Sequence, residues 1–189
     1  MMLPWIVVLL QLLNEKFRWP ASISATWYTN ACTPFMIILG SASILLMCYN
    51  GYDVVDDTLN TCAGLLGLCI CLFPCQGPSG MGDIVGTFQI YAYINNLYHS
   101  MAAILFFGIL AYNSFFQFTK SSGEMTKNKK IRNVIFRVCG VGMLLSFGML
   151  LLPRFQIRIW LLETIALFFF GVSWLTKANC YPWLFADKD

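Results

Sequence analysis

Two ionisable residues, His99 and Glu163, fall in otherwise apolar stretches of the sequence. An ionised side chain at the centre of a lipid bilayer costs about 3 kcal/mol or more, so such residues usually have a partner or a function. Asn95 precedes His99 by four residues and therefore shares its face of a helix. These residue types could accept and donate protons or bind the polar part of a ligand.

We predict that these residues gather in one polar layer near the outer face of a membrane. Both His99 and Glu163 come early in segments that we expect to run inward from that face. Ser24 and Tyr28 belong to a preceding outer loop and could join the layer. The alternative is that the same side chains only hydrogen-bond one helix to another, which is a common use of polar residues in membranes.

A second polar layer is expected near the inner face. Arg137 opens a segment that runs outward from that side, and Asp53 and Asp57 lie in a loop on the same side. An ion pair between Arg137 and one of these aspartates, fixing the helix ends, is the favoured interpretation. Arginine near a span end also commonly extends its charge to the interface.

The composition indicates an integral membrane protein. Hydrophobic residues make up 58% of the 189 residues and charged residues 11%, against roughly 25% charged in a soluble domain. A soluble fold of this size would lack the charged shell that it needs. We therefore predict an all-α, polytopic transmembrane bundle that forms one domain over residues 1–189. Its six expected spans are 2–17, 34–49, 59–73, 86–118, 133–152 and 159–176.

The first of these spans is the least certain feature of the bundle. Its apolar part, Met2–Leu13, is shorter than the roughly 20 residues that a crossing helix needs. It is not expected to be a signal peptide, because no basic segment precedes it and no clear cleavage site follows. It could be tilted or only partly submerged.

The distribution of lysine predicts the orientation. Five basic residues lie within 120–132, and loops rich in lysine and arginine usually stay in the cytoplasm. Alternation then places both termini and the Asp53–Asp57 loop inside. The aromatic loop 14–33, the glycine- and proline-rich loop 77–82 and the turn 153–158 fall outside. The expected location is the cytoplasmic (inner) membrane.

Several classes of function find no signal in the sequence. The single histidine makes a histidine-rich metal site improbable, and no cofactor motif is recognisable, so we predict neither metal nor cofactor. The short basic loop gives no indication of nucleic-acid binding. Most of the eight cysteines lie in apolar runs and are interpreted as packing residues. Cys32 and Cys75 both fall on the outer side, where a disulfide is an alternative to two free thiols.

The sequence resembles a family of small bacterial six-span membrane proteins of unknown function. The resemblance covers nearly everything after about residue 20 and is carried by segments such as 22–30, 49–56, 72–74, 118–120, 130–133, 160–163 and 170–177. It implies the six-span architecture and marks a set of positions of interest: Ser24, Tyr28, Asp53, His99, Arg137 and Glu163. A looser likeness to zinc-dependent membrane hydrolases of the alkaline-ceramidase type is rejected, because those use three histidines and this chain has one.

Three functions follow as hypotheses. The first is a non-enzymatic protein whose outer layer (Glu163, His99, Asn95, Tyr28 and Ser24) binds a lipid headgroup, a small polar ligand or a proton. The second is a channel-like homo-oligomer that packs through small residues such as Gly40–Ser43, Gly108, Gly140, Gly142 and Gly148. The third and least favoured is an intramembrane hydrolase with His99 as base. Membrane lipids are the expected partners.

Overall fold

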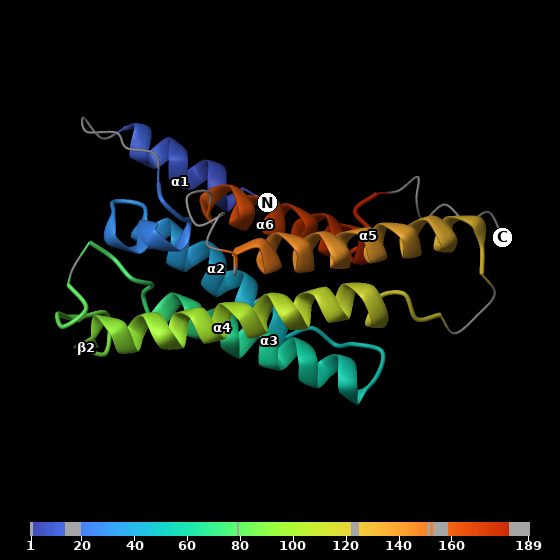
Figure 1. Cartoon of the computed structure of the whole chain (residues 1–189). Coiled ribbons are helices and arrows are strands. Elements are labelled where there is room, and N and C mark those ends of the chain that lie inside the picture. The colour runs from blue at the N-terminus through green and yellow to red at the C-terminus, as the bar shows by residue number, and fades with distance from the viewer. Residues whose placement is uncertain are drawn as a thin grey trace.

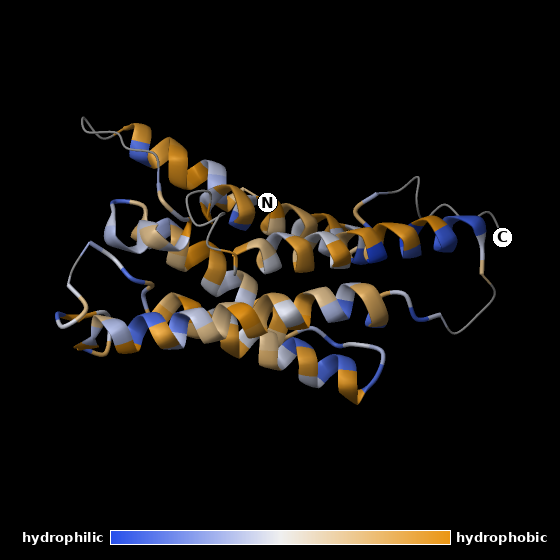
Figure 2. Cartoon of the chain, viewed as in Figure 1, coloured by the Kyte–Doolittle hydropathy of each residue, from blue (hydrophilic) through white to orange (hydrophobic). Residues whose placement is uncertain are grey.

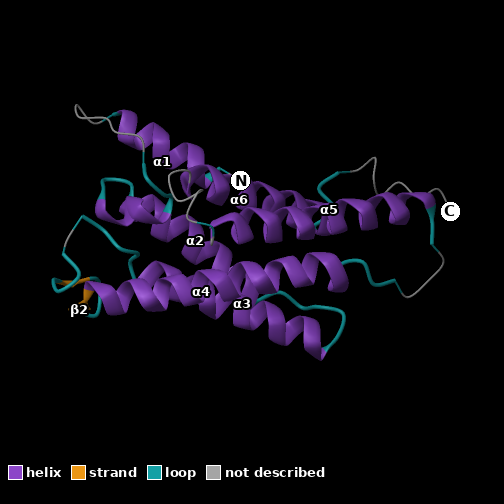
Figure 3. Ribbon diagram, viewed as in Figure 1, coloured by secondary structure: helices purple, strands orange, loops and turns teal. Residues whose placement is uncertain are grey.

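The computed structural model of the chain describes residues 2–13, 20–78, 80–121, 125–150, 152 and 159–181. Within these ranges the protein is all-helical apart from one short hairpin, so the all-α part of the prediction is confirmed (Figure 3). The helices form a bundle and lie roughly along one direction (Figure 1). They are α1 Leu3–Leu12, α2 Cys32–Met47, α3 Val54–Leu72, α4 Ala92–Tyr112, α5 Lys127–Leu150 and α6 Ile159–Lys177.

Four of the helices are long and apolar enough to cross a membrane: α3, α4 with its continuation to Gln117, α5 and α6. The other two are shorter, with 10 residues in α1 and 16 in α2. At 1.5 Å per residue they extend about 15 Å and 24 Å, whereas a bilayer core is about 30 Å thick. The structure therefore supports four of the six predicted spans. Hydrophobic residues dominate the middle of the bundle and hydrophilic ones its ends (Figure 2).

The fourth span begins later than predicted. Residues 86–91, which we expected to be helical, belong to an antiparallel hairpin between β1 Ile84–Val85 and β2 Ile90–Tyr91. Two residues of its turn have positive φ, 81° at Gly86 and 50° at Gln89, and a helix cannot accommodate this backbone. Span four therefore starts at Ala92. At its other end a π-helical turn, η2 (Asn113–Gln117), continues α4.

The predicted acidic loop is partly the first turn of α3. Asp53 is the N-cap of this helix, and its Oδ1 accepts a hydrogen bond from the backbone N–H of Asp56 at 2.9 Å. Asp56 and Asp57 lie in the first turn. Carboxylates are stabilised there by the unpaired N–H groups and the dipole of a helix N-terminus. The helix consequently starts five residues before the predicted boundary.

Helix α3 packs against both α2 and α4, and α5 packs against α6 and α4. Small residues allow these close approaches. Gly67 of α3 lies against the hydroxyl of Ser43, and a Cβ at Gly140 of α5 would stand 3.0 Å from the carbonyl oxygen of Ala111. Phe35, Phe106 and Met143 are among the fully buried side chains that fill the space between the helices.

The two ends of the bundle differ in character. We call one the hairpin end; it carries the hairpin and the 3-10 helix η1 (Ser24–Tyr28), at the left of Figure 1. The opposite, lysine end carries residues 48–53, 118–121 and 125–127. This arrangement agrees with the predicted grouping of loops onto two sides. Which end faces the cytoplasm stays a prediction.

Candidate functional site: a cavity with Glu163 and His99

Glu163 connects α6 to the segment that precedes η1. Its Oε2 accepts a hydrogen bond from the backbone N–H of Ile23 at 2.5 Å, and its Oε1 accepts one from the hydroxyl of Ser24 at 3.3 Å. A further backbone bond joins the same elements, from the N–H of Trp160 to the carbonyl oxygen of Ala21 at 3.2 Å. The carboxylate therefore anchors the start of η1 on the N-terminal part of α6.

His99 lies on α4 and is 5% exposed. Its Nδ1 is 2.8 Å from the carbonyl oxygen of Phe73, at the end of α3. Because a carbonyl oxygen only accepts, Nδ1 carries the proton of this bond. In the neutral ring Nε2 is then the unprotonated nitrogen, which can accept a hydrogen bond or a proton.

Glu163 and His99 line the same cavity, of about 440 Å³, at the hairpin end of the bundle. Its wall has a polar part and an apolar part. The polar part adds Ser22, Ser24, Cys75, Gln76, Asn96 and Ser100. The apolar part includes Phe35 and Leu39 of α2, Ile70 of α3, Phe106 and Phe107 of α4, Phe147 of α5 and Leu167 of α6. The predicted outer layer thus has its two ionisable members facing one space.

Two of the predicted site residues support this cavity rather than line it. The side-chain amide of Asn95 donates to the carbonyl oxygens of Val85 at 2.9 Å and Ile90 at 3.2 Å, which holds the hairpin on α4. The hydroxyl of Tyr28 donates to the carbonyl oxygen of Cys75 at 2.9 Å. Burial, together with the nearby Cys75 thiol, raises the pKa of Tyr28. Ser24 is the one loop residue of the prediction that contacts Glu163.

The cavity also contains residues that sequence reasoning did not assign to the site. The side-chain oxygen of Asn96 accepts a hydrogen bond from the backbone N–H of Gln76 at 2.8 Å. Burial and the neighbouring charge of Glu163 raise the pKa of Cys75 to about 12, so this thiol is protonated at neutral pH. Cys75 follows Pro74 in an irregular segment, and its sequence surroundings carry no pattern that places it beside α6.

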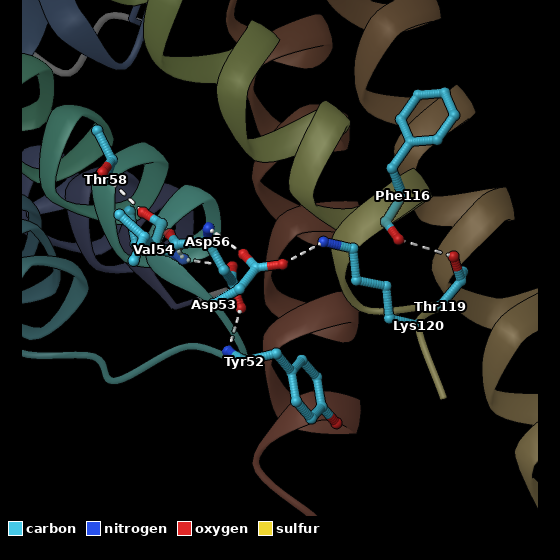
Figure 4. A network of polar contacts seen from close by, with 9 residues as sticks. Tyr52, Asp53, Val54, Asp56, Thr58, Phe116, Thr119 and Lys120 are labelled. Carbon is cyan, nitrogen blue, oxygen red and sulfur yellow. Dashed lines mark hydrogen bonds and ion pairs between the residues drawn. The ribbon is translucent and has the colours of Figure 1, made fainter. Parts of the chain in front are cut away.

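The inner polar layer differs from its prediction. Asp53 forms its ion pair with Lys120, with Nζ and Oδ2 2.7 Å apart (Figure 4). Asp57 accepts a hydrogen bond from the backbone N–H of Gly51. Arg137 is exposed on α5. It lies ten residues beyond the start of that helix, about 15 Å along its axis, whereas Lys120 is at the lysine end beside Asp53.

Asp56 belongs to a buried polar chain at the lysine end that the sequence did not indicate. It is fully buried, and its Oδ1 accepts from the side-chain amide of Asn60 at 2.9 Å. The Asn60 oxygen accepts in turn from Asn113 in the π-helical turn, at 3.1 Å. Next to it, the hydroxyls of Ser114 and Ser173 are 2.7 Å apart and join α6 to the same region.

In the described part of the chain, no three His, Cys, Asp or Glu side chains are grouped as metal ligands would be. All eight cysteines are free thiols, so Cys32 and Cys75 are not paired. Comparison with protein-family models, with curated proteins and with solved structures returns no match for this chain. The site must therefore be interpreted from its own geometry.

Proposed function

We propose that this protein is a multi-pass membrane protein that binds a lipid-like ligand in the cavity at the hairpin end. The observation that carries the proposal is the division of the cavity wall. One part presents the carboxylate of Glu163 and the imidazole of His99, and the rest is built from aliphatic and aromatic side chains of α2 to α6. A ligand with a polar head and a hydrocarbon chain matches both parts.

The chemistry of the polar part favours a head that donates hydrogen bonds. A carboxylate offers about four acceptor positions. Glu163 accepts from the backbone N–H of Ile23 and from the hydroxyl of Ser24, and a ligand could use the remaining acceptor capacity. Nε2 of neutral His99 is a further acceptor. The described residues that line the cavity include no lysine or arginine. An ammonium or hydroxyl group of a headgroup would therefore meet acceptors without a competing cation from these residues.

The size of the cavity is consistent with this ligand class. Pockets for small organic ligands typically occupy about 300 to 1,000 Å³, and this one has about 440 Å³. It would hold a headgroup and part of an acyl chain.

Ala103 lies on its wall in α4, whereas Leu105, two residues further, is 52% exposed on the outside of the bundle. Substitutions at these two positions therefore compare the cavity wall with the outer surface of the same helix.

The protein should be reconstituted into vesicles that contain a trace of phosphatidylethanolamine with a photoactivatable acyl chain. We expect crosslinks in peptides that contain the cavity wall. Ala103→Trp fills the cavity and should reduce labelling severalfold, because a buried indole occupies about 150 to 250 Å² of contact surface. Leu105→Trp should label like the original protein. Peptide mapping by mass spectrometry provides the measurement, with thermal unfolding as the check on folding.

The role of Glu163 is tested by the headgroup. Glu163→Gln should remove the preference for phosphatidylethanolamine over phosphatidylglycerol, which has no ammonium group, while labelling by the acyl chain persists. Equal labelling of Ala103→Trp and Leu105→Trp would refute a ligand in the cavity. An unchanged headgroup preference in Glu163→Gln would remove this carboxylate from the binding site.

A further inference from the structure

Three sulfur-bearing side chains meet where the start of α2 packs on the end of α3. Cys32 and Met36 are four residues apart on one face of α2, and their sulfur atoms are 3.8 Å apart. Cys71, in the last turn of α3, places its Sγ 4.0 Å from the carbonyl oxygen of Met36. The thiols of Cys71 and Cys32 also interact electrostatically. We call these three residues the sulfur cluster.

The sulfur cluster is partly enclosed by the protein. Cys71 is 4% exposed, whereas Cys32 and Met36 are half-buried. From η1, the indole N–H of Trp27 donates to the carbonyl oxygen of Cys71 at 3.3 Å. None of the three cluster residues lines the cavity with Glu163. The inference drawn from them therefore does not depend on the function proposed for that cavity.

The donor types of the cluster select the kind of metal that it could hold. Thiolate and thioether sulfur are soft ligands that suit Cu(I), whereas Mg²⁺, Ca²⁺ and Mn²⁺ are bound by oxygen. A structural zinc site takes four ligands from cysteine, histidine and carboxylate, and this cluster offers two cysteines and a methionine. Sequence analysis predicted no metal, because only the packing of α2 on α3 brings these residues together.

The spacing of the sulfur atoms also fits a bound metal. Sulfur ligands that surround a metal in one plane, each at about 2.3 Å, stand about 4 Å from one another. The 3.8 Å between the sulfur atoms of Cys32 and Met36 agrees with this requirement. Cys71 belongs to a different helix, so a metal held by all three residues would link α2 to α3.

We propose that the sulfur cluster binds one Cu(I) ion through the thiolates of Cys32 and Cys71 and the thioether of Met36. Each thiol gives its proton to the solvent when it binds the metal. One Cu⁺ and two thiolates then leave a single negative charge, and no electron is transferred. Because Cys32 is only half-buried, the ion can reach the cluster without separation of the helices.

The test measures Cu(I) binding by the whole protein in detergent, under argon, in competition with the coloured Cu(I) chelator bathocuproine disulfonate. The chelator withdraws Cu(I) from single thiols, so that only a site with several sulfur ligands competes with it. The original protein should retain one equivalent. Cys32→Ser and Cys71→Ser should each weaken binding at least about 100-fold, because even the loss of a group that only orients a ligand costs about 10- to 100-fold.

Methionine offers the matched control. Met36→Leu removes one sulfur atom at nearly constant volume, so the protein should stay folded while Cu(I) binding weakens about tenfold. Met47→Leu makes the same change eleven residues further along α2. Cys62→Ser removes an exposed thiol of α3. Both of these control variants should bind Cu(I) like the original protein.

Thermal unfolding without copper shows which variants are folded, and Met36→Leu should unfold at nearly the same temperature as Met47→Leu. Weaker binding in a folded Met36→Leu variant then reports a lost ligand. The proposal is overturned if the original protein leaves all Cu(I) with the chelator. Equal binding by Met36→Leu and Met47→Leu, or an equal loss in Cys62→Ser and Cys71→Ser, would overturn it as well.

Discussion

Glu163 accepts hydrogen bonds from Ile23 and Ser24, at the start of η1, with its two carboxylate oxygens, and the same side chain lines the cavity at the hairpin end. It can therefore position the wall of a binding site and contribute an acceptor to that site at once. His99 is comparable, since Nδ1 is bound to the backbone of Phe73 and the ring lines the same cavity. Each residue thus makes a contact that holds two elements together and can still accept a hydrogen bond from a ligand.

At the lysine end, the Asp53–Lys120 pair makes a prediction about pH. The hydrogen bond from Lys120, followed by the backbone bond from Asp56, lowers the pKa of Asp53 below its ordinary value of 3.8. A lowered folded-state pKa stabilises the protein above the ordinary value, and this contribution disappears as the pH falls through the lower, folded-state pKa. Lys120→Gln should therefore be less stable than the original protein at neutral pH, and the difference should vanish in strong acid.

Thermal unfolding in detergent, from neutral pH down to about pH 2, measures this difference. Lys130→Gln, which removes an exposed lysine of the same region, is the control and should show no such loss. The stability difference between Lys120→Gln and the original protein could instead be the same at every pH. That result would show that the pKa of Asp53 does not depend on Lys120.

At the scale of elements, α2 and α3 pack closely because glycine faces the neighbouring helix. A Cβ at Gly64 would meet the side chain of Met47 and would stand 2.5 Å from the carbonyl oxygen of Ser43. A Cβ at Gly108 of α4 would find nothing within 4 Å among the described residues. The small residues that we predicted for contacts between subunits are divided in the same way, since Gly140 packs against α4 and Gly108 does not contact another helix. Some pack within the chain, and others leave an open surface.

This division predicts opposite effects of the same substitution. Gly64→Ala should destabilise the protein by about 1 to 3 kcal/mol, because overpacking forces α2 and α3 apart. Gly108→Ala should be neutral or stabilising by up to about 1 kcal/mol, because alanine favours a helix more than glycine does. Reversible unfolding of both variants in mixed detergent micelles measures the two effects. Equal stability of the two would contradict the close packing at Gly64.

On the scale of the whole molecule, four helices long and apolar enough to cross a membrane run between two ends of different chemistry. One end carries the hairpin and the cavity with Glu163. The other carries the lysine-rich segment and a basic pocket whose wall includes Lys129, Arg132 and Lys177. The distribution of lysine predicts that the lysine end is the cytoplasmic one.

Labelling of single cysteines tests this orientation. In a variant without native cysteines, Gly82→Cys lies beside the hairpin and Met125→Cys precedes α5, and both positions are exposed. A membrane-impermeant maleimide should label Gly82→Cys in intact cells and Met125→Cys only after permeabilisation. The reverse pattern would invert the orientation. Labelling of both in intact cells would mean that α4 does not cross the membrane.

The sequence by itself determined the helical class, the apolar runs and the end of the bundle near which several polar residues lie. These properties depend on composition and on distance along one helix, so they can be obtained from a single chain. Depth was sufficient to place Glu163 and His99 in one layer. It also placed Asp53 and the lysine-rich segment at the same end.

Only the tertiary structure decided which side chains meet. A hydrogen bond depends on the rotation of each helix and on irregular segments whose course no periodicity encodes. For this reason Asp53 contacts Lys120 instead of Arg137, and Cys75 arrives in the cavity. The hairpin at 84–91 escaped prediction because its positive-φ turn interrupts a stretch that remains largely apolar. The basic pocket emerged in the same way, because Lys129 and Lys177 are distant in sequence and meet only where α5 packs on α6.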